Sequence, residues 1–160
     1  MSDADIITEY CKEYQLSRYT QNIPHPYKKK NAVWFINHCA EEWKAKKAYI
    51  YMITHDGKLV GTIGLNMQNE GVAEIGYWVG IPHWGKGYAT EATKLMIKEG
   101  FNKLKLHKIY ATHHPKNSAS GRVMKKAGMK YEGTLREHIK AKGKYWDLAY
   151  WSTLRREYRR

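Results

Sequence analysis

The sequence contains few of the residues that build metal centres and disulfide frameworks. Only two of its 160 residues are cysteine, Cys11 and Cys39, and they form no metal-ligand pattern. None of its eight histidines belongs to an H-E-x-x-H motif or a cysteine–histidine cluster. We therefore expect no bound metal, and we expect both cysteines to be free thiols in a reducing, cytoplasmic compartment.

Long apolar runs and acidic residues are also scarce. No stretch approaches the apolar length that spans a bilayer, and no secretory signal is evident, so we expect no membrane association. Against 28 lysines and arginines stand only 15 acidic residues, for a formal net charge of +13. This imbalance favours anionic partners: a phosphorylated cofactor, an acidic peptide or nucleic acid. Because the basic residues are scattered along the chain, we do not expect nucleic acid to be the primary ligand.

Changes in hydrophobic period along the chain predict one α+β domain over residues 1–160. Ser2 with Asp5 resembles a capping box, Asn31 a helix start, and Asn117 and Gly128 the two ends of a later helix. Helices are predicted over residues 3–14, 89–104 and 117–128, and a further helix begins at Asn31. Strands are predicted over residues 47–54, 58–67, 71–80, 107–114, 129–139 and 145–154. We expect a mixed, mainly antiparallel sheet with helices packed on it.

A glycine-rich loop lies between the third predicted strand and the helix after it. Gly80, Gly85 and Lys86 fit the G-x-x-x-x-G-K frame of an ATP-binding loop, but Gly87 cannot supply the hydroxyl that such a loop gives to Mg²⁺. The dinucleotide pattern G-x-G-x-x-G fails as well, because Thr90 occupies the place of its third glycine. The free amides of a helix start still favour a bound anion. Glycines alone leave a turn without any ligand equally open.

Two longer motifs resolve this choice by resemblance. "EIGYWVGIPHWGKGYATEA" (74–92) and "NSASGRVMKKAGMKYEGTLREH" (117–138) resemble the GNAT superfamily of acetyl-CoA-dependent N-acetyltransferases, and within it the ribosomal-protein-alanine N-acetyltransferase branch. The superfamily signature Q/R-x-x-G-x-G/A falls on residues 84–89, with Trp84 in its first place, as is usual in this branch. The resemblance implies that the loop binds the pyrophosphate of acetyl-CoA, a co-substrate held without a metal.

The same resemblance implies where the cofactor lies. A splayed pair of strands, 76–80 and 108–114, is expected to hold the pantetheine arm, with a Val79 amide placed for the oxyanion of the transition state. Asn117 and Ser120 match the family's N-x-x-S, which implies that Asn117 contacts pantetheine and that Ser120 lies near the sulfur, with helix capping as the alternative for both. The expected cofactor-binding residues are Val79, Ile81, Gly85, Lys86, Gly87, Tyr88, Ala89, Thr90 and Asn117.

Direct acyl transfer also needs a base for the amine and an acid for the departing thiolate. We expect Glu74 to be the base, with a salt bridge or solvated strand residue as the alternative reading, and Ser120 to be the acid. Glu137 and His138 are second candidates for the base. A related type places its acidic group at about the position of Ile139, which cannot take part in acid–base chemistry.

The acceptor is expected to be a primary amine, with the N-terminal α-amine of a ribosomal protein as the favoured choice. An amino acid, antibiotic or polyamine acceptor stays open, as does a non-catalytic module that binds coenzyme A or RNA. Aromatic residues expected near the acceptor groove, or alternatively in the core, are Trp34, Tyr77, Trp78, Tyr145 and Trp146. The family usually has a strand before its first helix, but here Ser2 already resembles a helix cap. Either the start of the sequence is truncated or the sheet lacks this strand, and a sheet edge left bare would predict a homodimer.

Overall fold

The computed structural model describes residues 1–158. Five helices, two short 3₁₀ turns and six strands follow one another in these residues. In chain order they are α1 (Asp3–Cys11), α2 (Tyr14–Ser17), α3 (Lys29–Lys44), β1 (Ala48–His55), β2 (Lys58–Asn69), β3 (Val72–Val79), η1 (Ile81–His83), α4 (Tyr88–Asn102), β4 (Lys108–His113), α5 (Ser118–Lys126), β5 (Lys130–Ala141), β6 (Lys144–Leu154) and η2 (Arg155–Glu157). Both cysteines are free, Cys11 in α1 and Cys39 in α3.

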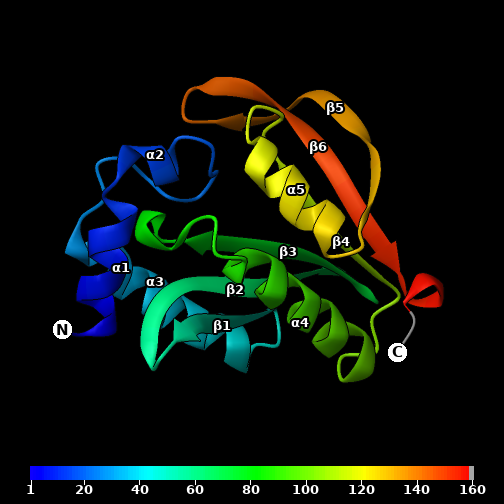
Figure 1. Ribbon diagram of the computed structural model, residues 1–160, viewed down its shortest axis with the longest axis horizontal. Helices are drawn as coiled ribbons and strands as arrows, with labels where there is room; N and C mark the ends of the chain where they lie inside the picture. Colours follow the sequence, from blue (N-terminus) through cyan, green and yellow to red (C-terminus); the bar gives the residue numbers. More distant parts are fainter. Residues whose placement is uncertain (159–160) are drawn as a thin grey trace.

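The strands form one mixed sheet in the order β1-β2-β3-β4-β6-β5 (Figure 1). Every neighbouring pair is antiparallel except β3 with β4, which α4 connects as a parallel pair. No strand precedes α1 within residues 1–158, so β1 is an edge of the sheet. The predicted α+β class and the mainly antiparallel sheet are confirmed.

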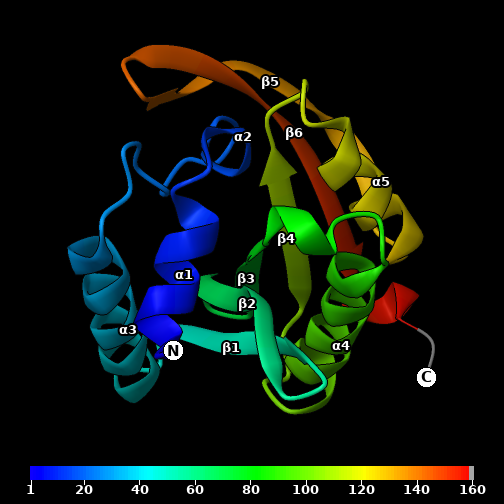
Figure 2. The ribbon, with the colours of Figure 1, turned by 60° about the vertical axis from the view of Figure 1, so that its left-hand side comes forward.

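Helices cover both faces of the sheet (Figure 2). The α4 and α5 face packs against a core that includes Leu65, Phe101 and Ile109, all nearly inaccessible to solvent. The α1 and α3 face packs against a smaller core that includes Ile7 and Trp78. Apolar side chains that recur at helical spacing on α4 and at alternate positions on β3 produce these two cores.

Local signals placed most helix ends correctly. The capping box of Ser2 with Asp5 is present, Asn117 caps α5 by accepting a hydrogen bond from the amide of Ser120, and Gly128 follows α5 with a φ of +88°. The predicted cap at Asn31 is wrong, because the helix begins at Lys29. Asn31 lies inside the first turn, where its Oδ1 accepts a hydrogen bond from the amide of Lys28 at 2.8 Å.

The strands β3 and β4 separate partway along their length. Their pairing runs from Val72 opposite Lys108 to Ile75 opposite Ala111 and stops there. Beyond that point β3 continues along β2 to Val79, whereas β4 continues along β6 to His113. The expected splay is therefore present, and it opens the middle of the sheet toward the end of β3.

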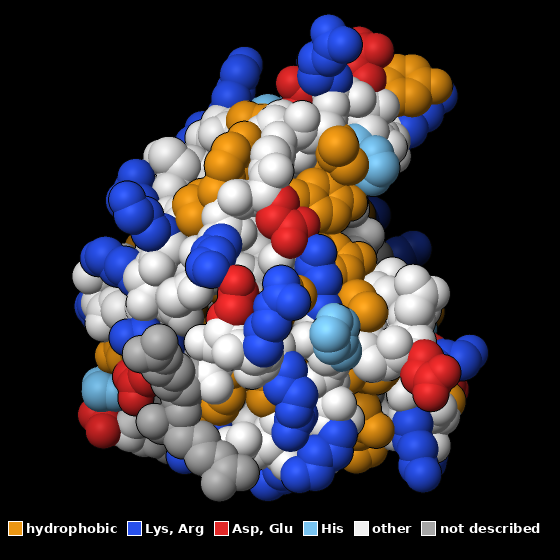
Figure 3. Space-filling model, turned by 90° about the vertical axis from the view of Figure 1, so that its right-hand side faces the viewer, with side chains coloured by type: hydrophobic (Ala, Val, Ile, Leu, Met, Phe, Trp, Pro, Cys, Tyr) orange, Lys and Arg blue, Asp and Glu red, His pale blue; other side chains and the backbone are white. Residues whose placement is uncertain are grey.

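Positive charge is spread over the surface. On the face shown in Figure 3, lysine and arginine side chains are dispersed among neutral and acidic ones and form no single stripe. Within residues 1–158, no helix is both long and apolar enough to cross a membrane.

Candidate active site

The glycine loop leaves the start of α4 open to a ligand. Gly85 and Gly87 have φ values of +74° and +86°, which favour glycine, and no atom lies within 4 Å of the position that a Cβ would occupy at either residue. Gly87 is the N-cap of α4 and has no side chain to cap the helix. The first hydrogen bond within the helix runs from the amide of Glu91 to the carbonyl of Gly87. The amides of the first turn therefore have no partner within the helix and can bind an anion.

Contacts with β3 and α1 hold this loop in place. The indole Nε1 of Trp84 donates to the carbonyl of Val79 at 2.6 Å, which ties the loop to the end of β3. The Tyr10 ring packs on Gly80 so closely that a Cβ there would lie 2.8 Å from it, and the Tyr10 hydroxyl lies 2.9 Å from Nε2 of His83. A loop anchored at both sides presents its amides without reorganising.

The electric field beside the loop is positive. Partial burial, followed by the charges of Lys86 and His55, lowers the pKa of His83. Burial is the larger cause, and the smaller contribution comes from positive charge beside the start of α4. Lys86 is the nearest such charge on the loop, and it favours a bound anion.

The splay exposes part of the backbone of β3. The amide of Gly80 donates to the carbonyl of Val60, so alternation along the ladder turns the backbone groups of Tyr77 and Val79 away from β2, toward the opening. Trp84 already occupies the Val79 carbonyl, which leaves the Val79 amide facing the gap. Ile81 lies outside β3, in η1, and its carbonyl accepts from the amide of Trp84 at 3.1 Å.

The side chains of Tyr77 and Ser120 meet on the α4 and α5 side of this opening. The Tyr77 hydroxyl donates to Oγ of Ser120 at 3.1 Å, and burial raises the pKa of Tyr77 to about 12. Oδ1 of Asn117 is engaged in the cap of α5, at 3.3 Å from the amide of Ser120. From the sequence, Tyr77 is expected only to be an aromatic residue near the acceptor groove or in the core. The structure adds its hydrogen bond to Ser120.

Glu74 lies on the opposite face of the sheet. Odd and even residues of a strand point to opposite faces, so the Glu74 carboxylate projects toward α1 and α3 while Tyr77 projects toward α5. The hydroxyl of Thr112 donates to Oε1 of Glu74 at 2.9 Å. Burial raises the pKa of Glu74, partly opposed by this hydrogen bond. A half-buried carboxylate with a raised pKa is suited to accept a proton from an amine.

The second candidate bases lie at the far end of the same face. Nε2 of His138 lies 3.2 Å from the hydroxyl of Tyr150, whereas the Glu137 side chain is exposed and its amide donates to Asp147. Ile139 is paired with Trp146 in the sheet. Of the other expected aromatic residues, Trp78 and Trp146 are buried, and Trp34 and Tyr145 are exposed.

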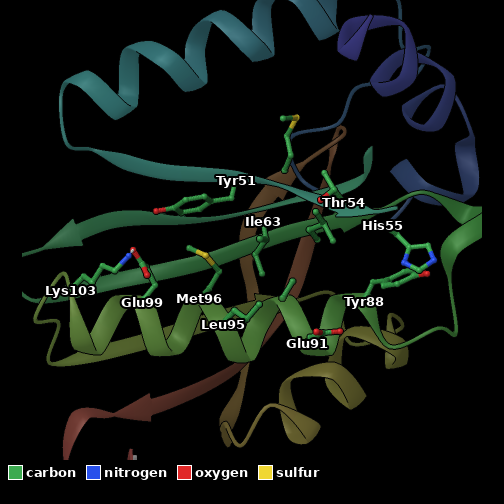
Figure 4. Close-up of a pocket in the computed structure, with 13 residues that line it drawn as sticks. Tyr51, Thr54, His55, Ile63, Tyr88, Glu91, Leu95, Met96, Glu99 and Lys103 are labelled. Carbon is green, nitrogen blue, oxygen red and sulfur yellow. Dashed lines mark ion pairs between the residues drawn. The ribbon is translucent and has the colours of Figure 1, made fainter. Parts of the chain in front are cut away.

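A separate groove of about 520 Å³ lies between β1 and α4 (Figure 4). Apolar side chains of β1, β2 and α4 line its middle, among them Tyr51, Ile63, Leu95 and Met96. The ion pair of Glu99 with Lys103, at 3.0 Å, lies at one end, and His55 and Tyr88 lie at the other. The groove therefore approaches the first residue of α4 but opens at the edge of the sheet, not at the splay.

Comparison with known proteins agrees with this geometry. A family model described as the acetyltransferase (GNAT) domain matches residues 1–130. The chain belongs to the GNAT family. It is similar to the uncharacterized N-acetyltransferase p20 of Bacillus licheniformis, with 35% identity over 99% of this chain and 90% of that protein. This GNAT protein is accordingly an N-acetyltransferase.

Solved structures share the fold of this N-acetyltransferase. An acetyltransferase of the GNAT family from Bacillus anthracis is 30% identical, with a TM-score of 0.85 over 97% of this chain and 90% of that one. RimJ of Mycobacterium smegmatis, solved in complex with CoA-disulfide, has a TM-score of 0.89 over 99% of this chain and 80% of that one. Its identity is 22%, so this second likeness concerns the fold alone.

Proposed function

We propose that the protein transfers the acetyl group of acetyl-CoA directly to the N-terminal α-amine of a protein, with a ribosomal protein as the favoured acceptor. One observation carries the proposal: Glu74 and Ser120 lie beside the same splay but on opposite faces of the sheet. This arrangement provides one entrance for the cofactor, beside α4 and α5, and another for the amine, beside α1 and α3.

The residues around the splay fit acetyl-CoA. The amides of Gly85 to Thr90 hold the pyrophosphate, and Lys86 adds positive charge, because the start of α4 is uncapped and open. The Val79 amide faces the opening, where it binds the thioester oxygen as charge develops there. Nδ2 of Asn117 is available to pantetheine, since capping uses Oδ1. When bound, acetyl-CoA supplies the activated acetyl group.

The two side chains beside the splay take opposite parts in proton transfer. Glu74 accepts a proton from the incoming ammonium group, and its raised pKa brings it nearer to that of an α-amine, about 8. Ser120 gives its proton to the departing sulfur on the other face. Tyr77 donates a hydrogen bond to Ser120 Oγ, so the hydroxyl proton of Ser120 points away from Tyr77.

Charge supports a protein terminus over a polyamine. The carboxylate of Glu74 lies beside the splay on the acceptor face, and the chain as a whole carries a net charge of +13. A polycationic acceptor would be repelled by such a surface, whereas an acidic protein partner would be attracted.

Release of free thiol from acetyl-CoA, measured against a panel of N-terminal peptides, amino acids, antibiotics and polyamines, tests the acceptor class. We expect peptides with a free α-amine to be the best acceptors and their Nα-blocked forms to be inactive. Preference for a small amine over every peptide would overturn the choice of acceptor. Absence of thiol release with all of them would overturn the proposed activity itself.

We also propose that two copies associate through β1. No strand covers this edge within the described part of the chain, residues 48–54 carry no charge, and Met52 is 57% exposed. Sedimentation velocity over a wide concentration range is expected to show a dimer that Met52→Lys weakens. A monomer at every concentration would refute this assembly.

A further inference from the structure

An irregularity in β5 places His138 on the acceptor face. Leu135 pairs with Leu148 and Ile139 pairs with Trp146, so three residues, 136–138, lie opposite Asp147 alone. Such bulges bend a strand and redirect its side chains, and they are frequent beside active sites. This bulge is therefore a candidate for a functional device.

The bulge stores backbone strain and is held by a specific contact. Glu137 has a φ of +46°, in the left-handed region that costs a residue other than glycine about 1 kcal/mol or more. Oδ1 of Asp147 accepts a hydrogen bond from the amide of Glu137 at 2.8 Å, which satisfies the backbone group that the irregular pairing displaces. A strained turn kept by a carboxylate indicates that the direction of the next residue, His138, matters.

His138 ends a row of polar side chains that crosses four strands. From β3 to β5 the row is Glu74, Thr112, Tyr150 and His138. Its members are joined by the Thr112–Glu74 hydrogen bond at 2.9 Å and the Tyr150–His138 hydrogen bond at 3.2 Å. Thr112 is the direct cross-strand partner of Tyr150, so their side chains are neighbours. Within the described residues, the row is therefore hydrogen-bonded at its two ends, and in its middle Thr112 and Tyr150 are neighbours without a hydrogen bond between their side chains.

Tyr110 supports the middle of this row. It is the register partner of Glu74, and its ring stacks on that of Tyr150 with centroids 5.8 Å apart. Burial raises the pKa of both tyrosines, and the charge of Glu74 adds to each shift. The carboxylate therefore acts electrostatically on the Tyr150 hydroxyl. Along the row, solvent exposure increases from half-buried Glu74 to exposed His138.

A base that works repeatedly must lose its proton after each cycle. Glu74 is half-buried, and the burial that lets it accept a proton also hinders release of that proton to water. Imidazole groups exchange protons readily near neutral pH. The exposed end of the row carries such a group, with Asp147 beside it on β6.

We propose that His138, acting through Tyr150, is the solvent end of a path that carries the proton of the acceptor amine away from Glu74. This inference rests on the proposed acetyl transfer. A water between Glu74 and Tyr150 takes the proton of the Glu74 carboxyl and passes one of its own to Tyr150 Oη, as the Tyr150 hydroxyl proton passes to Nε2 of His138. The imidazolium then releases a proton from Nδ1 to water. Only O–H and N–H bonds form and break, and Glu74 returns to the carboxylate.

Chemical rescue tests the path with the full chain. In His138→Ala, kcat should fall at least about tenfold with acceptors whose amines are protonated at the assay pH, and KM for acetyl-CoA should not change. Added imidazole should restore most of the lost rate. Tyr150→Phe should show the same loss without rescue, because the hydroxyl that imidazole would serve is gone. Amines that are already neutral at the assay pH should be acetylated by both variants at close to the wild-type rate.

One substitution at Glu137 separates the path from a general effect on folding. β-branched Glu137→Val disfavours the left-handed backbone and should show a loss that imidazole rescues, whereas exposed Glu70→Gln, away from the row, should keep wild-type turnover. Wild-type turnover in His138→Ala, or a loss that imidazole does not restore in a folded variant, would overturn the path. Absence of thiol release by the wild type would instead overturn the proposed acetyl transfer, and the path with it.

Discussion

The hydroxyl of Tyr77 on β3 donates a hydrogen bond to Oγ of Ser120 on α5 across 3.1 Å. Burial raises the pKa of Tyr77 to about 12, so the phenol stays protonated and remains the donor at neutral pH. The serine oxygen therefore accepts from Tyr77, and its own proton is free to point elsewhere. This bond orients the group that we propose as the acid.

Removing this hydrogen bond should impair turnover more than binding. In Tyr77→Phe we expect kcat to fall about tenfold, less than the roughly hundredfold loss in Ser120→Ala, with KM for acetyl-CoA unchanged. Loss of the bond should cost about 1 kcal/mol of stability. Tyr131→Phe is the matched control, because the Tyr131 hydroxyl lies 2.7 Å from Thr134 on an exposed part of β5. Steady-state kinetics would refute the role if Tyr77→Phe raised KM for acetyl-CoA and left kcat intact.

Glu74→Gln should lower kcat by about a hundredfold and leave acetyl-CoA affinity unchanged. Wild-type kcat should rise with pH through the raised pKa of Glu74, because only the carboxylate accepts a proton, and this limb should vanish in the variant. Exposed Glu70→Gln serves as the control. An unchanged kcat in Glu74→Gln would exclude Glu74 as the base.

Although Glu74→Gln should lower kcat, it should raise the stability of the folded protein. The pKa of Glu74 is higher in the folded state than in the unfolded state, so its protonated form favours folding, and that contribution is lost as pH rises through the folded-state pKa. Thermal unfolding should therefore show Glu74→Gln gaining stability relative to the wild type as the pH rises from the ordinary glutamate pKa of 4.5 through the raised pKa of the folded state. A relative loss as the pH rises would contradict the burial of a carboxylate at this site.

Gly87→Ala should weaken acetyl-CoA binding at least about tenfold. The φ of +86° strains alanine by about 1 kcal/mol, and its Cβ would enter the open space in which we place the pyrophosphate. Gly128→Ala, at a φ of +88° beyond α5, imposes the same strain away from the loop. Titration calorimetry should show reduced affinity in the first variant only. Equal affinities would argue against a phosphate at Gly87.

Two substitutions at Asn117 separate capping from cofactor contact. Aspartate keeps an oxygen to cap the amide of Ser120 but loses the Nδ2 donor, so Asn117→Asp should preserve stability and raise KM for acetyl-CoA. Asn117→Ala loses the capping oxygen as well as the donor, so it should lose about 1 kcal/mol of stability and also raise KM for acetyl-CoA. If Asn117→Asp binds acetyl-CoA as the wild type does, capping is the whole role of this residue.

The predictable parts of the site are those that depend on local backbone needs. Gly85 and Gly87 adopt positive φ values, and Asn117 caps a helix, because short-range geometry demands such residues and the sequence displays them. The same local signal explains the wrong prediction that Asn31 is a helix cap. Asparagine also satisfies the amide of the residue three places before it, and the sequence does not say which of the two positions is the cap.

The contacts between distant strands could not be predicted in this way. The Glu74–Thr112 bond depends on the parallel register of β3 with β4. These two strands are far apart in the sequence, and they pair because α4, which connects them, packs on the sheet. The β5 bulge was not foreseen either, since Glu137 is not a residue that marks a left-handed turn. Sequence therefore named the candidates, and only the fold showed which of them meet.

Thermal unfolding with S-acetylated ligands in EDTA most directly tests whether the exposed amides at the start of α4 bind a diphosphate without a metal. Acetyl-CoA at about 100 times its Kd should raise Tm by roughly 5–10 °C, whereas S-acetyl-pantetheine, which has no diphosphate, should leave Tm nearly unchanged. No rise with saturating acetyl-CoA, together with a rise produced by ATP and Mg²⁺, would contradict the account.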